Sequence, residues 1–182
     1  MLQLDFSPFP VLTTERLLLR KLTAEDEQGI FALRTDDIVN KYLDRIKARS
    51  VEDARKFIQK VNNSIDSNEL IYWGICLRPK TRIIGTVCFW NIAVENDKAE
   101  IGYELLPACQ GQGLMQEALS AIIDYGFTSM RLATIEAVAD LQNERSVKLL
   151  EKIGFKKEGN KKDILPGNDN TDNMIVYRLN RQ

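Results

Sequence analysis

Residues 100–119 restrict the possible folds more than any other segment, because a strand, a glycine loop and a helix follow one another there without a break. Residues 99–106 have the pattern of a strand that ends before Pro107, and residues 114–129 place apolar side chains along one helical face. Gly111 and Gly113 lie between them, where glycine lets the backbone turn sharply and approach a ligand closely. The unpaired N–H groups and the positive dipole end of the helix then face an anion. The segment therefore predicts a pyrophosphate site.

Two common phosphate-binding motifs do not fit this loop. A P-loop requires Gly-Lys-Ser/Thr at the start of the helix, whereas Leu114 and Met115 follow Gly113 here. A dinucleotide fingerprint requires a third glycine, and Gln116 stands at that position. On these residues alone, a plain glycine turn between a strand and a helix is the alternative interpretation.

The rest of the chain alternates between strands and helices. Thr23 and Ser50 each have an aspartate three positions later, a capping-box pattern that predicts the start of a helix, and Gly154 is typical of a helix end. Residues 30–43 predict one or two short helices, and residues 143–153 predict another. Strand patterns occupy residues 17–19, 70–77, 83–92, 133–139, 155–158 and 175–179, with a polar loop at 160–173. We expect a mixed α/β (α+β) fold with antiparallel middle strands and a central helix crossover, in a single domain spanning residues 1–182.

Composition excludes several classes of chemistry. The chain has no histidine, which removes Ser-His and Cys-His catalysis and the commonest metal ligand, and we expect no metal site. Its three cysteines give no disulfide or zinc pattern. The net charge of −1 argues against nucleic-acid binding, and the absence of a signal peptide or a long apolar run predicts a cytoplasmic protein with no membrane partner.

The loop from Gln110 to Met115 resembles the coenzyme A loop of GNAT-superfamily N-acetyltransferases, although Met115 stands where that family has Gly or Ala. Other segments resemble the ribosomal-protein-alanine/serine N-acetyltransferase-like branch in order and spacing. They are residues 12–20, 84–85, 99–103, 116–119, 143–146 and 152–155. The resemblance implies the GNAT acyl-CoA N-acyltransferase fold, with a mostly antiparallel sheet that is splayed in the middle and flanked by helices. It also implies acetyl-CoA as cosubstrate and a primary amine acceptor, either a protein N-terminus or a small molecule.

The same resemblance implies a set of cofactor contacts, each with a plainer alternative. The backbone of Leu105 and Leu106 would bind the pantetheine arm, although both are also suited to the core. Asn143 would reach the cofactor or only cap a helix, and Ser146, on the same helical face, would bind the departing thiolate or face solvent. The loop contacts would come from Gln110, Gly111, Gln112, Gly113, Leu114 and Met115.

An alkyl amine must lose a proton to attack a thioester, so a general base is needed. Glu100 and Glu104 lie four positions apart on one strand and share a face, while Tyr103 faces the other way and is expected in the core. Both glutamates are left open as the base. We expect direct transfer in a ternary complex, with a catalytically silent acyl-CoA-binding module as the alternative, and a homodimer is left open.

Overall fold

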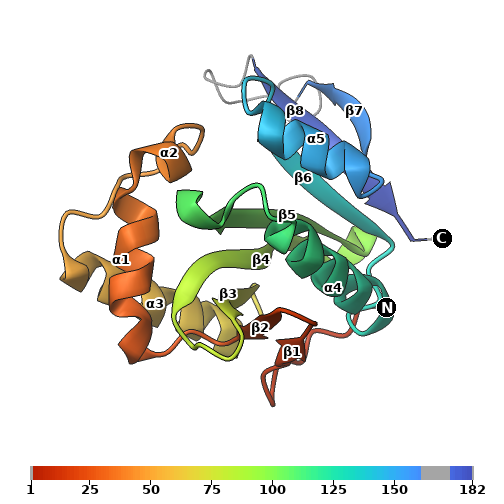
Figure 1. Cartoon of the computed structure of the whole chain (residues 1–182). Coiled ribbons are helices and arrows are strands. Elements are labelled where there is room, and N and C mark those ends of the chain that lie inside the picture. The colour runs from red at the N-terminus through yellow and green to blue at the C-terminus, as the bar shows by residue number, and fades with distance from the viewer. Residues whose placement is uncertain (1, 161–172, 182) are drawn as a thin grey trace.

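The computed structural model describes residues 2–160 and 173–181, which form one eight-stranded sheet in the order β1-β2-β3-β4-β5-β6-β8-β7 (Figure 1). The strands are β1 Leu12–Thr13, β2 Leu17–Arg20, β3 Ile71–Leu77, β4 Ile83–Ala93, β5 Lys98–Leu105, β6 Thr134–Asp140, β7 Lys156–Asn160 and β8 Met174–Asn180. The helices are α1 Glu27–Thr35, α2 Asp37–Asn40, α3 Val51–Asp66, α4 Leu114–Thr128 and α5 Glu144–Lys152. Short 3-10 turns occupy Ala24–Asp26, Val94–Asn96 and Pro107–Cys109.

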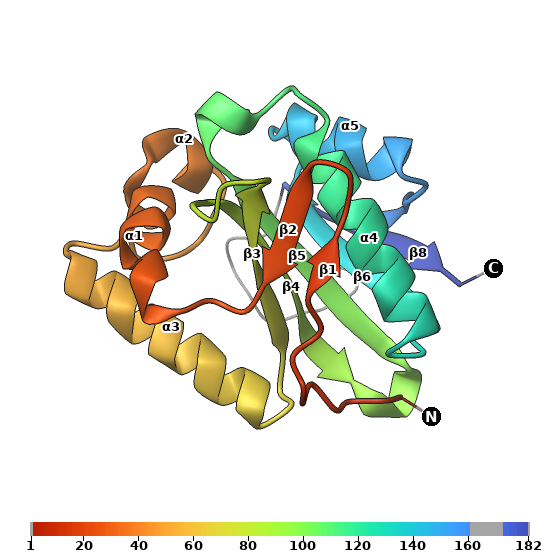
Figure 2. The ribbon, with the colours of Figure 1, turned by 60° about the horizontal axis from the view of Figure 1, so that its bottom comes forward.

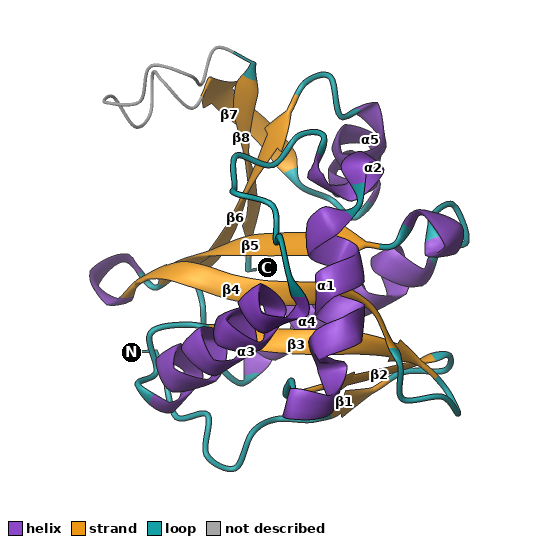
Figure 3. Ribbon diagram, turned by 90° about the vertical axis from the view of Figure 1, so that its left-hand side faces the viewer, coloured by secondary structure: helices purple, strands orange, loops and turns teal. Residues whose placement is uncertain are grey.

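The centre of the sheet opens into a gap. β5 and β6 are parallel, with α4 as the crossover between them, and the other neighbouring strands of the described chain pair antiparallel. The two strands pair only from Lys98 opposite Thr134 to Glu100 opposite Glu136. Beyond that point β5 stays with β4 and β6 stays with β8, so the two halves of the sheet diverge (Figure 3). The predicted mixed fold with a splayed, mostly antiparallel sheet is therefore confirmed.

Helices cover both faces of the sheet, with α1 and α3 on one side and α4 and α5 on the other (Figure 2). On α3, the Phe57 ring meets Tyr72 of β3 with ring centroids 5.7 Å apart. On α4, a side chain at Gly126 would meet the Phe89 ring of β4 at 2.8 Å, so only glycine allows this close approach. Tyr72 pairs directly with Cys88, so these two side chains share one face of the sheet. Phe89 is adjacent to Cys88 on β4 and therefore points to the opposite face. The α3 contact and the α4 contact thus lie on opposite faces.

Most predicted elements form close to their expected ends. Ser50 accepts a hydrogen bond from the Asp53 N–H at 3.3 Å and begins α3, and Gly154 takes the left-handed conformation with φ of 98°. The first helical region differs, because α2 ends at Asn40 and residues 42–43 lie outside it. The predicted polar loop at 160–173 lies mostly outside the described residues. No helix in residues 2–160 or 173–181 is long and apolar enough to cross a membrane.

Candidate active site

The glycine loop enters α4 as the sequence predicts. Gly111 and Gly113 have φ of 74° and 76°, in the left-handed region that favours glycine, and Gly113 is the N-cap of α4. Leu114 and Met115 are buried, so their side chains belong to the core and only their backbone N–H groups are suited to a phosphate. The methionine that departs from the family pattern therefore points into the core and does not fill the space outside the helix start.

An ion pair between Arg16, which directly precedes β2, and Glu117 of α4 supports this loop. Arg16 donates from Nη1 to the Gln112 carbonyl at 2.9 Å and from Nε to Glu117 Oε2 at 2.6 Å. Glu117 also accepts from the Thr14 hydroxyl at 2.5 Å and from the Arg16 backbone N–H at 2.9 Å. Burial raises the pKa of Glu117, but these hydrogen bonds outweigh burial and leave the pKa lowered. Sequence reasoning missed this contact, because only the family resemblance of residues 12–20 and 116–119 marked the two segments.

At the end of β5, the backbone N–H and C=O groups of successive residues point either towards β4 or towards the gap. Leu106 donates its N–H to the Ile84 carbonyl at 2.8 Å and accepts from the Cys109 N–H at 2.9 Å. Backbone groups of successive strand residues alternate sides, so Leu105 faces the gap instead. The predicted role of the Leu106 backbone in binding pantetheine is therefore not favoured, because β4 already uses its N–H group and the turn at Pro107–Cys109 uses its carbonyl.

The side chains of Gln110 and Gln112, which the sequence predicts as cofactor contacts, form hydrogen bonds within the protein. Gln110 donates from Nε2 to the Leu105 carbonyl at 2.9 Å and accepts from Arg145 of α5 at 2.7 Å. Gln112 donates from its side chain to the Ala108 carbonyl at 2.9 Å. The bonds of Gln110 connect the loop to β5 and α5.

Asn143 and Ser146 lie at the start of α5, on the other side of the gap from β5. Asn143 caps the helix and accepts from the Ser146 N–H at 3.3 Å, which establishes its structural role. The Ser146 hydroxyl lies 2.8 Å from the hydroxyl of Tyr103 on β5. Burial raises the pKa of Tyr103 to about 12, although the hydrogen bond to Ser146 lowers it. Tyr103 is half-buried and packs against the core, in line with the expectation, but the sequence did not indicate that its hydroxyl reaches α5.

On the opposite face of β5, Glu104 belongs to a polar network. Its carboxylate accepts from Arg45 Nη2 at 2.6 Å and from the Thr86 hydroxyl at 3.2 Å, and its side chain is 7% exposed. Arg45 also donates from Nε to Asn40 at 2.7 Å, and the Tyr72 hydroxyl donates to Thr86 at 2.9 Å. The loop after α2 thus brings a guanidinium to this carboxylate.

Glu100 lies on the last paired rung before the strands diverge. It accepts from the Asn91 side-chain amide at 3.1 Å and is half-buried. Its neighbour across the rung, Glu136, forms ion pairs with Lys98 and Arg178, each at 2.9 Å. Burial raises the pKa of Glu136, but these two cations outweigh burial and lower the pKa overall. The negative charge of Glu136 is therefore balanced by two cations, and Glu100 does not lie beside an unpaired carboxylate.

A hollow of about 460 Å³ lies between the loop after α2 and the second half of the sheet. Its lining combines the loop after α2 with the end of β6 and the start of β8, and the residues are Lys41, Tyr42, Leu43, Asp44, Asp140, Asn173 and Met174. Figure 1 shows this loop facing the divergent half of the sheet. Its walls come from both sides of the splay, which makes it suitable for an acceptor that approaches the gap.

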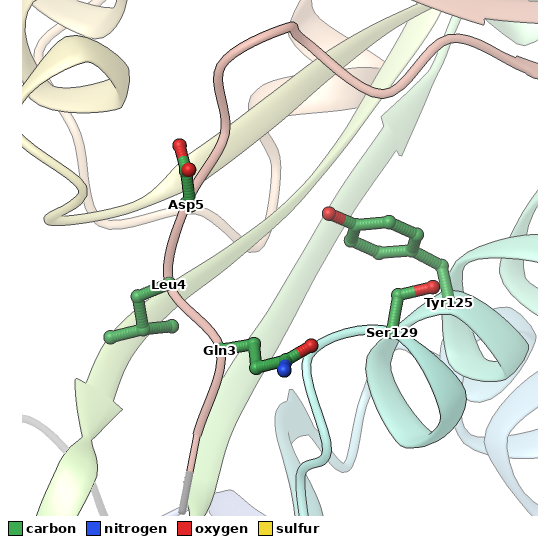
Figure 4. A pocket seen from close by; sticks show the side chains of 5 residues that line it. All are labelled: Gln3, Leu4, Asp5, Tyr125 and Ser129. Carbon is green, nitrogen blue, oxygen red and sulfur yellow. The ribbon is translucent and has the colours of Figure 1, made fainter.

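A second hollow, of about 510 Å³, lies near the other end of α4 (Figure 4). Gln3, Leu4 and Asp5 of the N-terminal segment line it together with Tyr125 and Ser129, and the Gln3 side chain points towards Ser129. This is the carboxyl end of α4, where the helix dipole is negative and disfavours an anion. We therefore exclude it from the cofactor site.

A splayed sheet with a helix N-terminus at the opening of the gap is the architecture of acyltransferases that use a coenzyme A thioester, and this chain has that architecture. A family model described as "Acetyltransferase (GNAT) domain" matches residues 16–156, and the chain belongs to this family. The protein is an N-acetyltransferase that uses acetyl-CoA as its cosubstrate.

Similar proteins support this assignment. The chain is 36% identical over 171 residues to the uncharacterized N-acetyltransferase YoaA of Bacillus subtilis, covering 94% of this chain and 97% of the relative. It is 35% identical over 106 residues to a [ribosomal protein uS5]-alanine N-acetyltransferase of Escherichia coli, covering 58% of this chain and 55% of that protein. The crystal structure of a GNAT-family acetyltransferase from Bacillus anthracis matches with a TM-score of 0.80 at 27% identity, covering 94% of this chain and 98% of the other.

Proposed function

We propose that the protein transfers an acetyl group directly from acetyl-CoA to a primary amine, in a complex that holds both substrates. The observation that carries this proposal is the glycine loop at the start of α4, which lies beside the gap between β5 and β6. The pyrophosphate would bind the backbone N–H groups that follow Gly113, and the pantetheine arm would lie along the gap-facing side of Leu105, whose carbonyl also accepts from Gln110. This arrangement directs the thioester towards Ser146.

We assign the catalytic roles to residues that lie on or beside the two faces of β5. The amine nitrogen attacks the thioester carbon, and its proton passes to a base directly or through water. We assign the base to Glu100, because it lies on the last paired rung before β5 and β6 diverge, whereas Glu104 forms an ion pair with Arg45. The C–S bond then breaks, and Ser146 donates a hydrogen bond to the departing thiolate. Holding the amine and the thioester together supplies much of the rate gain.

We propose a protein N-terminus as the acceptor, with a small amine as the alternative. The support is the similarity to the uS5-alanine N-acetyltransferase and the 460 Å³ hollow between the loop after α2 and the divergent strands. An extended N-terminal segment could approach the gap through this hollow.

Acetyl-CoA consumption should be measured with a panel of N-terminal peptides, polyamines, amino acids and aminoglycosides. We expect turnover with N-terminal peptides. Turnover with small amines alone would correct the acceptor, and binding of coenzyme A without turnover on any amine would favour the silent acyl-CoA-binding module.

Glu100→Gln should lower kcat by about 100-fold or more, the usual contribution of a general base, and leave coenzyme A affinity unchanged. Glu95→Gln, on the exposed turn between β4 and β5, is the matched control and should keep the parental rate. A parental kcat in Glu100→Gln across the pH range would transfer the role to Glu104 or to water.

A further inference from the structure

A pair of hydroxyl groups joins the two sides of the splay. Tyr103 projects from β5, Ser146 lies in the first turn of α5, and their oxygen atoms are 2.8 Å apart. The two residues are 43 positions apart in the sequence, so only the fold brings them together. The pair lies beside the predicted position of the thioester sulfur, on the face of β5 that carries the buried Ile101 and Leu105.

The number of protons in this pair limits what each hydroxyl can do. A hydroxyl has one proton to donate and two lone pairs that accept. If Ser146 donated to Tyr103, it would have no proton left for the thiolate. If Tyr103 donates to Ser146, the serine proton is available to a second acceptor. The Tyr103 hydroxyl keeps its proton, because burial raises its pKa to about 12.

The backbone of Ser146 is also held in place. Asn143 accepts from the Ser146 N–H at 3.3 Å and caps α5, which restrains the serine at the edge of the gap. With its backbone restrained by Asn143 and one lone pair occupied by Tyr103, the serine hydroxyl has few directions in which its proton can point. Such preorganised donors stabilise developing negative charge best.

We propose that Tyr103 is a positioning residue that donates to Ser146 and thereby directs the Ser146 O–H towards the departing sulfur. The inference rests on the proposed function, which places the thioester beside Ser146. In this step the C–S bond breaks and its electron pair stays on sulfur, and the carbonyl forms again as the amide. The proton lost by the amine has gone to Glu100, and both hydroxyl groups keep their protons.

Three variants test the coupling in steady-state kinetics with acetyl-CoA: Tyr103→Phe, Ser146→Ala and the double variant. Tyr103→Phe should lower kcat about three- to tenfold, since one neutral hydrogen bond is lost, with the KM for acetyl-CoA unchanged. Ser146→Ala should lower kcat at least about tenfold, because it removes a hydrogen bond to a charged group. In the Ser146→Ala background, Tyr103→Phe should change kcat by less than about twofold, because neighbours that act as a unit are not additive.

Two further variants separate this role from a structural one. Tyr177→Phe removes the hydroxyl of a buried tyrosine on β8, away from the gap, and should keep the parental kcat. Ser146→Thr retains the hydroxyl, so its kcat should fall again when Tyr103→Phe is added.

The outcomes distinguish the inference from the proposed function. An unchanged kcat in Tyr103→Phe, or an equal loss with and without Ser146, would overturn the role of Tyr103 and leave the acetyl transfer intact. A parental kcat in Ser146→Ala would overturn both the thiolate role of Ser146 and the inference. Failure of the parent protein to consume acetyl-CoA with any amine would instead refute the proposed function.

Discussion

Gly113→Asp should weaken coenzyme A binding much more than Gly113→Asn. Gly113 has φ of 76°, so any side chain there is strained by about 1–2 kcal/mol, and Asn and Asp tolerate this region best. A Cβ atom at this position would lie 3.5 Å from Arg16 Nη2, which is an ordinary van der Waals distance and not a clash. Both variants should therefore fold and lose about 2–8 °C in Tm for this strain. They differ from each other only in charge.

The size of the charge effect follows from Coulomb's law. A carboxylate at position 113 would lie about 6 Å from a phosphate at the helix start, and an effective dielectric constant of about 20–40 gives a repulsion of about 1.4–2.8 kcal/mol. This corresponds to binding that is about 10- to 100-fold weaker. Arg16, whose guanidinium lies beside the new side chain, screens part of the charge and favours the lower end of this range.

Isothermal titration with coenzyme A measures this difference, and the rise in Tm at millimolar acetyl-CoA provides an independent measure. The Gly113→Asn variant should keep most of the affinity and most of the Tm rise. If the two variants lost affinity equally, negative charge at this position would not matter and the pyrophosphate would bind elsewhere. An unchanged affinity in Gly113→Asp would refute the site altogether, as would a Tm rise with ATP or NAD but none with coenzyme A.

Two further predictions concern pH and cysteine chemistry. The pKa of Glu117 is lowered from 4.5 by hydrogen bonds that outweigh burial, so its contribution to stability is complete above about pH 4.5 and is lost as the pH falls through the folded-state pKa. The Tm advantage of the parent over Glu117→Gln should therefore be constant near neutral pH and shrink below pH 4.5, and a difference that stayed constant down to pH 3 would contradict the ion pair. Cys109→Ala should retain most activity and initial-rate plots should intersect, because the proposed direct transfer requires both substrates to be bound together. Parallel lines, or acetyl label on Cys109 in the absence of acceptor, would show a covalent route.

Local patterns in the sequence were sufficient for most of the fold. The capping box that begins α3, the hairpin of β3 and β4 and the left-handed glycines before α4 each depend on residues within a few positions of one another. Their conformations therefore follow from short-range sterics and hydrogen bonding, which the sequence displays directly. The family resemblance added the splay, which no local pattern indicates.

The tertiary structure alone decided how the site residues are connected. Arg16 and Glu117 are 101 positions apart, and Arg45 and Glu104 are 59 apart, yet each pair forms an ion pair at 2.6 Å. The sequence identified Glu104 as one of two possible bases, and the fold surrounded it with partners that favour Glu100 for that role. The sequence likewise predicted an interior position for Tyr103, and the fold positioned its hydroxyl against Ser146. Such contacts depend on how strands and helices far apart in the chain pack together, and residue spacing along the sequence carries no information about that distance.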